Sequence, residues 1–502
     1  MGAGDVFLVS SYVLTLVGVL FVLFKEKTDS ARRFSWLLAI IFVPVAGIFL
    51  YILLSGNFFT RTKRMVRAAR RANAHYESIL RSQETRLKEL MASDDHGDFA
   101  QYGALLHLNL VYGKSPILRD NSIDLFIDGK AKFEALFEEI RQAQSSIHVS
   151  YFIFQNDKTG NRLVELLAER AAAGVAVRLL YDHVGSIRTS ASMFRNLRRA
   201  GGRVSRFFPV SLVNPFQVNF RNHRKLVIVD GRAAWFGGMN VGDEYANESP
   251  KHPWYWRDTH VRITGPAVQL LQKVFLVDWY SASERDEPLF DDELLPTLFP
   301  RADKLGDPSA LNLPPERHRD GIPAQIVASG PDDMENDEIR DALILMIGRA
   351  RQSVRIETPY FTPDEAFYTA LKIAALSGIR VEIIVPGNWD KWYVKPAAMP
   401  FIEDLLTCGV RFWYYRGFIH SKMFIIDDKV VSIGTTNVDK RSFSLHFELN
   451  AFFYSPDSGA LCTAIFEEDK THSDPVDEAD FKEACLIKRA YWNLMSLFSP
   501  IM

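Results

Sequence analysis

The sequence predicts an α/β protein in which two similar repeats pack about a pseudo-two-fold axis, preceded by an N-terminal two-helix transmembrane hairpin. Three observations predict this architecture. Two apolar stretches open the chain, strands and helices alternate in both halves of the remainder, and one polar motif occurs twice with identical spacing. We expect five regions in chain order, at residues 1–59, 60–104, 105–283, 284–323 and 324–502.

The composition is that of a folded protein close to electrical neutrality. Of 502 residues, 47% are hydrophobic, and 59 Lys and Arg oppose 61 Asp and Glu for a net charge of -2. This balance argues against a surface built to neutralise nucleic-acid phosphates, so we expect no nucleic-acid partner. The three cysteines lack paired spacing, which excludes a disulfide framework and a zinc-site pattern. A reducing compartment is the simpler interpretation.

Region 1–59 contains two apolar stretches, at residues 6–24 and 34–54. Each has about 20 residues, the length of a helix that crosses a bilayer. A cleaved signal peptide is the alternative for the first stretch, but no Lys or Arg precedes it and no small-residue cleavage site follows. A buried soluble helix is the alternative for the second. Two such stretches in tandem favour a hairpin, with Pro44 and Gly47 as positions for a kink.

Basic residues flank the second stretch on both sides. Four lie in the connector and six lie between Arg61 and Arg71, whereas none precedes the first stretch. The positive-inside rule therefore favours both termini in the cytoplasm. Within region 60–104, residues 60–93 are polar and free of proline, which predicts a basic helix beside the membrane. A plain solvated helix is the alternative.

From about residue 105 the same pattern of elements occurs twice. Each copy has a strand, a helix and a second strand, at residues 146–149, 163–173 and 174–180 in the first half and 353–356, 366–375 and 378–384 in the second. The continuous apolar runs suit strands buried on both faces, so each half is expected to be an α/β unit with a mostly parallel sheet. Between the halves, residues 284–323 contain seven prolines, which predicts a linker or an irregular insertion.

A polar motif of the form His-x-Lys-x4-Asp lies at the same place in both repeats, followed by glycine and asparagine at matching offsets. The motif residues are His223, Lys225, Asp230 and Asn240 in the first copy, and His420, Lys422, Asp427 and Asn437 in the second. One copy would be a weak signal. Two copies at equivalent positions of a repeat make coincidence a poor explanation.

The motif residues suit chemistry at a phosphate. Strand alternation places the histidine and lysine of each copy on one face. When the repeats pack, two histidines, two lysines (Lys225 and Lys422) and two asparagines (Asn240 and Asn437) can line one pocket whose donors fit phosphate oxygens. One imidazole can attack phosphorus while the other protonates the departing alcohol, without a metal ion or a cofactor. The residues alone do not assign these two roles.

These motifs resemble the phospholipase D superfamily and, within it, the bacterial cardiolipin synthase family. Further residues that carry the resemblance are those at 237–245, 256–260, 358–361 and 437–442, together with the N-terminal hairpin. The resemblance covers nearly the whole chain, and it implies that both repeats are phospholipase D-like. Gly238 and Thr435 stand where that family often has serine, so Gly238 has no hydroxyl to offer to a phosphate.

The resemblance implies a role for each site residue. His223 would be the nucleophile that forms a phosphohistidine, and His420 the acid that then becomes the base. Asp258 and Glu448 would each orient an imidazole through its other ring nitrogen. Asp230 and Asp427 complete the catalytic motif, and in the family they are more often structural than reactive.

The resemblance also implies a function. We expect a phosphatidyltransferase of the bacterial inner (cell) membrane, multi-pass and with its catalytic domain in the cytoplasm, that joins two phosphatidylglycerol molecules into cardiolipin and releases glycerol. Its partners would be membrane lipids, with a homo-oligomer possible. A phospholipase D that hydrolyses phosphodiester lipids and a phosphatidylserine synthase are the alternatives. The net charge and the hairpin count against a superfamily nuclease, and the two intact motifs count against a non-catalytic scaffold.

Overall fold

The computed structural model describes residues 3–25, 30–54, 63–74, 76–92, 97–209, 219–250, 254–283, 298–299, 321–330 and 337–499. The chain divides into two compact units, one of Met1–Arg61 with Phe208–Phe220 and one of Thr62–Phe207 with Arg221–Met502. Most of the linker predicted at residues 284–323 lies outside the described residues. Within it, Leu298 and Phe299 are buried.

The described N-terminal helices are α1 (Ala3–Lys25), α2 (Ser30–Phe42) and α3 (Pro44–Leu54). The second apolar stretch is divided before Pro44, because proline has no amide hydrogen and ends the helix that precedes it. The three helices pack around Val22, Ile40 and Tyr51. In the part of the chain that the structure describes, no helix is both long enough and apolar enough to cross a membrane, so the predicted transmembrane hairpin is not confirmed.

Residues 60–104 do not form the single helix that was predicted. They contain α4 (Lys63–Ala74), α5 (Glu77–Ala92) and the start of α6 (Gly97–Val111). The break between α4 and α5 buries Tyr76, whose hydroxyl donates to the Gln269 carbonyl at 3.4 Å. The apolar side chains of α6, among them Leu105 and Leu106, enter the core of the second repeat. This region therefore packs on the repeats and is not a free solvated helix.

A 15-stranded sheet runs through both repeats. The first repeat contributes β1 (Leu118–Phe126), β2 (Ser146–Tyr151), β3 (Ala176–Asp182), β4 (Arg203–Phe207), β5 (Leu226–Val229), β6 (Ala233–Gly237) and β8 (His260–Thr264). The second contributes β9 (Ile322–Ser329), β10 (Ser353–Glu357), β12 (Arg380–Pro386), β13 (Arg411–Tyr415), β15 (Met423–Ile426), β16 (Val430–Gly434), β18 (Glu448–Tyr454) and β19 (Ser473–Pro475).

The strand order confirms the two repeats. In the first repeat the strands lie in the order β4-β3-β2-β5-β6-β8-β1, and the corresponding order in the second repeat is β13-β12-β10-β15-β16-β18-β9. The two halves of the sheet meet where β1 pairs with β9. The prediction of a mostly parallel sheet was wrong. Within the 15-stranded sheet, parallel pairing is confined to β2, β3 and β4 and to β10, β12 and β13. Tight turns after β5 and β15 make the following strands antiparallel.

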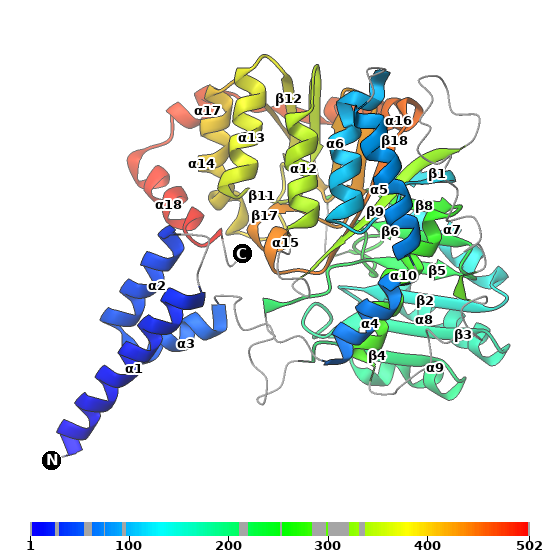
Figure 1. The fold of residues 1–502 in the computed structure, drawn as a ribbon, viewed down its shortest axis with the longest axis horizontal. Coiled ribbons are helices and arrows are strands. Elements are labelled where there is room, and N and C mark those ends of the chain that lie inside the picture. Colours follow the sequence, from blue (N-terminus) through cyan, green and yellow to red (C-terminus); the bar gives the residue numbers. More distant parts are fainter. Residues whose placement is uncertain are drawn as a thin grey trace. The chain divides into compact units, whose positions relative to one another are not determined.

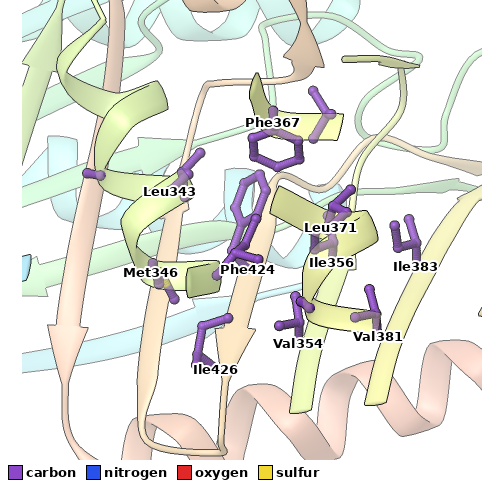
Figure 2. Packing of buried hydrophobic residues seen from close by; sticks show 14 of the residues in the cluster. Leu343, Met346, Val354, Ile356, Phe367, Leu371, Val381, Ile383, Phe424 and Ile426 are labelled. Carbon is purple, nitrogen blue, oxygen red and sulfur yellow. The ribbon is translucent and has the colours of Figure 1, made fainter. Parts of the chain in front are cut away.

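Helices cover both repeats in corresponding order (Figure 1). The first repeat has α7 (Gly129–Gln142), α8 (Lys158–Ala172), α9 (Arg195–Arg199) and α10 (Ala267–Ala282), and the second has α12 (Glu338–Gly348), α13 (Glu365–Leu376), α14 (Val394–Thr407) and α16 (Pro456–Thr471). Figure 2 shows Leu343 of α12 and Leu371 of α13 beside Ile356 of β10 and Phe424 of β15. Burial of such side chains holds the strands that carry the polar motifs.

Candidate active site

Two short backbone pairings join the repeats beside the motif histidines. In one, β7 (Trp256–Arg257) pairs in parallel with β14 (Phe418–Ile419), and the amide of His420 donates to the Arg257 carbonyl at 2.6 Å. In the other, Asn222 pairs with Phe447, whose carbonyl accepts from the amide of His223 at 3.0 Å. Each pairing ends one residue before a histidine of one repeat and a carboxylate of the other, which sets them side by side.

Each motif histidine is hydrogen-bonded to a carboxylate of the other repeat. Nδ1 of His223 lies 2.9 Å from Oε1 of Glu448, and Nδ1 of His420 lies 2.7 Å from Oδ2 of Asp258. All four side chains are buried, the most exposed being His223 at 8%. Because Nδ1 of His223 faces a carboxylate, its neutral imidazole carries the hydrogen there and keeps a lone pair on Nε2.

Two fully buried lysines lie beside the histidines. Nζ of Lys225 donates to the carbonyl of His223 at 2.6 Å, and Lys422 donates to the carbonyl of His420. Burial, followed by the charges of these lysines, holds the pKa of both histidines well below 6.5. Burial also lowers the pKa of Lys422 to about 8. The two lysines thus gather positive charge beside the two histidines at one buried site, and an anionic phosphodiester would relieve it.

The surroundings of the two orienting carboxylates differ. Thr435 Oγ1 donates to Oε2 of Glu448, whereas Oδ1 of Asp258 accepts from the amide of Thr259 at 2.7 Å. A Cβ atom on Gly238 would lie 2.0 Å from Oδ1 of Asp258. Gly238 thus makes room for the carboxylate, while its counterpart Thr435 makes a hydrogen bond. Burial raises the pKa of Asp258 to about 7, against the lowering effect of Lys422.

The two motif asparagines make different contacts. Oδ1 of Asn240 accepts from the amide of Ile153 at 3.1 Å, and its Nδ2 donates to the Tyr245 hydroxyl at 3.0 Å. Both atoms are thus held by protein groups. Oδ1 of Asn437 is buried and has no hydrogen-bond partner among the described residues. That either amide binds the substrate phosphate stays a prediction.

The two motif aspartates accept hydrogen bonds from backbone amides and from no imidazole of the described residues. Asp230 accepts from the amides of Ser145 and Ser146 at 2.7 and 2.9 Å. Asp427 likewise accepts from Gln352 and Ser353 at 2.7 and 2.9 Å. Both have a φ of 53°, at the turns that follow β5 and β15. Their carboxylates therefore fix the starts of β2 and β10, and a catalytic role for either aspartate stays a prediction.

Reasoning from sequence did not identify His446. Its Nδ1 lies 3.7 Å from Oε1 of Glu448, and its ring centroid lies 5.5 Å from that of His223. Burial lowers the pKa of His446 to about 3. The available signal was its position two residues before Glu448, where extended backbone points both side chains the same way. His223, His446 and Glu448 offer ligand atoms within 4.8 Å of one another, a set that could hold a metal ion.

Comparison with known proteins identifies the family. A family model described as cardiolipin synthase, PLD-like domain, matches residues 136–279 and 343–470. The chain belongs to the bacterial cardiolipin synthase family. A model described as phospholipase D-nuclease N-terminal matches residues 13–56.

Relatives in this cardiolipin synthase family match along the whole chain. The major cardiolipin synthase of Bacillus subtilis is 36% identical over 505 residues, covering 100% of both chains. The cardiolipin synthase of Oceanobacillus iheyensis is 35% identical over 503 residues, again covering 100% of both. A cardiolipin synthase of Staphylococcus aureus is 34% identical and covers 98% of this chain and 96% of the relative. The phosphatidylserine synthase of Haemophilus influenzae has the same fold, with a TM-score of 0.57, 14% identity, and coverage of 79% of this chain and 98% of that one.

Proposed function

We propose that this protein transfers a phosphatidyl group from one phosphatidylglycerol to a second, forming cardiolipin and releasing glycerol. The observation that carries the proposal is the pair of histidine–carboxylate contacts built across the repeats, with two buried lysines beside them. The family membership supports the choice of lipid, since the relatives that match the whole chain are named cardiolipin synthases.

In the first step, Nε2 of His223 attacks the phosphorus of the first phosphatidylglycerol. A P–N bond forms and the bond from phosphorus to the glycerol oxygen breaks, giving a phosphatidyl-histidine. His420 gives the proton from its Nε2 to the departing glycerol oxygen. Glu448 stabilises the positive charge that develops on the ring of His223, and Lys225 and Lys422 stabilise the charge on the phosphate oxygens.

The Asp258–His420 pair is suited to the role of acid. Burial raises the pKa of Asp258 to about 7, so this pair can retain a proton near neutral pH even though burial and Lys422 lower the pKa of the imidazole. A proton on Asp258 can pass to Nδ1 while Nε2 releases its own to the leaving group. This supports His420 as the acid and His223, whose pKa is held low, as the nucleophile.

In the second step, the glycerol hydroxyl of a second phosphatidylglycerol replaces the glycerol that has left. His420 takes its proton, the oxygen attacks phosphorus, and the P–N bond breaks to restore His223. Transfer to lipid rather than to water requires a site that excludes water. Phe152 packs 5.0 Å from the ring of His223, and Trp256 packs 5.4 Å from that of His420, which supports transfer over hydrolysis.

We propose further that the N-terminal unit holds the enzyme at the membrane that contains its substrate. The family match over residues 13–56 supports this, as do the exposed apolar side chains of α1 and α3, including Leu16, Val17 and Phe49. Spanning of the bilayer, a cytoplasmic catalytic domain and a homo-oligomer stay predictions. A cysteine placed on the exposed surface of α8 should resist an impermeant thiol reagent in intact cells and react after lysis. Labelling in intact cells would reverse the orientation.

Incubation with one lipid tests the proposed reaction. Purified full-length protein should convert phosphatidylglycerol alone into cardiolipin and glycerol in equal amounts, with a chelator present and no added nucleotide. Mass spectrometry of the lipids gives the readout, with His223→Ala as the inactive control. Phosphatidic acid as the dominant product would instead support a hydrolase. A strict requirement for a nucleotide-linked lipid would support a phosphatidylserine synthase.

A further inference from the structure

A pocket of about 660 Å³ lies between the loop that follows β12, the helix α14 and the C-terminal helix α18 (Leu486–Ser496). Its lining is largely aromatic and includes Trp254, Trp389 and Trp492. None of the catalytic side chains described above lines it. The pocket is therefore a separate feature of the catalytic unit, and its chemistry needs its own explanation.

Three lysines line the same pocket, and aromatic faces rather than carboxylates hold them. Lys391, Lys395 and Lys488 lie 4.9, 5.0 and 5.2 Å from the ring centroids of Tyr360, Tyr414 and Trp492. Within the described ranges, no carboxylate forms an ion pair with any of the three. The three lysines are exposed and, in the described part of the chain, unpaired by carboxylates, so an anion that enters the pocket can contact them directly.

Trp389 adds an unused hydrogen-bond donor. Its indole Nε1 is buried and has no partner among the described residues. A buried donor without a partner costs stability unless a ligand or water satisfies it. A phosphate or ester oxygen bound beside the lysines would supply the missing acceptor.

One lysine of the pocket acts on the catalytic histidines through its charge. Lys391 belongs to the pocket lining, and its charge is close enough to lower the pKa of both His223 and His420. Positive charge in the pocket therefore influences the catalytic site, although the two share no lining side chain.

An apolar stripe lies on α18, which also contributes to the pocket. Ile487, Tyr491 and Leu494 recur at spacings of four and three residues, so they share one helix face, and all three are exposed, with Ile487 at 82%. Lys488 and Trp492 of the same helix line the pocket. Trp392 is 75% exposed and lines it as well. An apolar stripe flanked by lysine and tryptophan is typical of a helix lying at a bilayer surface.

We propose that this pocket binds one anionic phospholipid drawn from the membrane surface, with its phosphate on Lys395 and Lys488 and its acyl chains along the tryptophan rings. The apolar face of α18 contacts the bilayer. The site thus serves as a loading site for phosphatidylglycerol. Only this last assignment rests on the proposed function. Binding of an anionic lipid does not.

Photo-crosslinking tests the site in the full-length protein. The probe is phosphatidylglycerol with a diazirine in one acyl chain, in phosphatidylcholine vesicles, and His223→Ala prevents turnover. Cross-links should map by peptide mass spectrometry to α14 and α18. Unlabelled phosphatidylglycerol or phosphatidic acid should compete, and phosphatidylcholine should not. Lys395→Gln and Lys488→Gln should each reduce the yield about five-fold. The matched control, Lys130→Gln with Lys372→Gln on α7 and α13, should leave it unchanged.

Three outcomes would overturn the proposal. Cross-links confined to other segments, equal competition by phosphatidylcholine, or an unchanged yield in both pocket variants would each exclude an anionic lipid site. Protection of α18 by a second copy of the chain in the absence of lipid would assign the stripe to a dimer interface. Failure of the proposed reaction is distinguishable, because it would abolish cardiolipin formation by the wild-type protein while the cross-links in the His223→Ala background persist.

Discussion

Nδ1 of His223 in the first repeat lies 2.9 Å from Oε1 of Glu448 in the second, and His420 of the second repeat makes the reciprocal contact with Asp258 of the first. Each repeat therefore contributes the imidazole of one pair and the carboxylate of the other. Neither pair forms unless both repeats are folded and joined along β7–β14 and at Asn222–Phe447.

Replacing Glu448 should act through His223 although the two belong to different repeats. Glu448→Gln keeps the shape but loses the charge that stabilises the imidazolium, so kcat should fall by about 10³–10⁴-fold, the range seen when a histidine-orienting carboxylate is neutralised. In a double-mutant cycle, the loss of kcat in the variant with both Glu448→Gln and His223→Ala, expressed as a free energy, should be much smaller than the sum of the two single losses. Additivity with His223→Ala, and coupling to His420→Ala instead, would contradict the cross-repeat assignment.

Replacing His223 and replacing His420 should have different effects on the covalent intermediate. His223→Ala should form no covalent intermediate. With His420→Ala, a nitrophenyl phosphodiester, whose leaving group needs no proton, should still yield a trapped phosphatidyl-enzyme because the missing base also slows its breakdown. Peptide mass spectrometry should place the phosphoryl group on His223. A phosphoryl group on His420 would exchange the roles, and wild-type rates in either variant would exclude the two-histidine mechanism.

Gly238 should tolerate no side chain. In Gly238→Ala the new Cβ would lie 2.0 Å from Oδ1 of Asp258 and would displace the carboxylate from His420. Such misplacement should lower kcat by about 10²-fold while the protein stays folded. Gly348→Ala is the matched control, since a Cβ there meets nothing within 4 Å. Equal activity of the two variants would show that the Asp258 contact does not matter for catalysis.

Asp427 should matter for stability and not for chemistry. Asp427→Asn removes the charged carboxylate that accepts hydrogen bonds from the amides of Gln352 and Ser353. The free energy of unfolding should therefore fall by about 1–3 kcal/mol. Urea unfolding measures this loss, and kcat per folded molecule should stay near that of the wild type. A loss of kcat at unchanged stability would instead support the predicted catalytic role of Asp427. Asp230→Asn should behave alike.

Acidification should destabilise the protein through buried neutral histidines. Burial lowers the pKa of His446 and of His148 to about 3, below the 6.5 of an exposed histidine. Between pH 6.5 and pH 3 the unfolded chain binds more protons than the folded chain. The stability that these neutral histidines allow is therefore fully present above pH 6.5 and is lost as the pH falls toward 3. Each group contributes about 1.4 kcal/mol per pH unit. His446→Asn should make the decline in unfolding free energy between pH 6 and 4 shallower by about that slope, and an unchanged decline would contradict the buried neutral state.

The repeats and the residues of both motifs could be predicted from the sequence, because identical spacing at equivalent positions can be recognised without knowing how the chain packs. It could not say which carboxylate meets which histidine. That pairing depends on β7 lying beside β14, and each of these strands has only two residues. The residues that they bring together, Asp258 and His420, are 162 positions apart in the sequence. Contacts between such distant segments leave no local pattern in a single sequence.

Predictions that depended on local pattern alone were less complete. The apolar runs of β5 and β15 look like those of buried parallel strands, yet the turns at Asp230 and Asp427 reverse the chain and make the pairing antiparallel. The helix predicted over residues 60–93 breaks so that Tyr76 can be buried against α10, a tertiary contact that helix propensity does not encode.

The exchange of carboxylates between repeats also bears on biosynthesis. A ribosome that has made only the first repeat has made His223 and Lys225 but not Glu448, so the nascent chain lacks the group that fixes the tautomer of the proposed nucleophile. We therefore expect a chain that ends before β18 to be inactive toward phospholipid, because the pair formed by His223 and Glu448 is then incomplete.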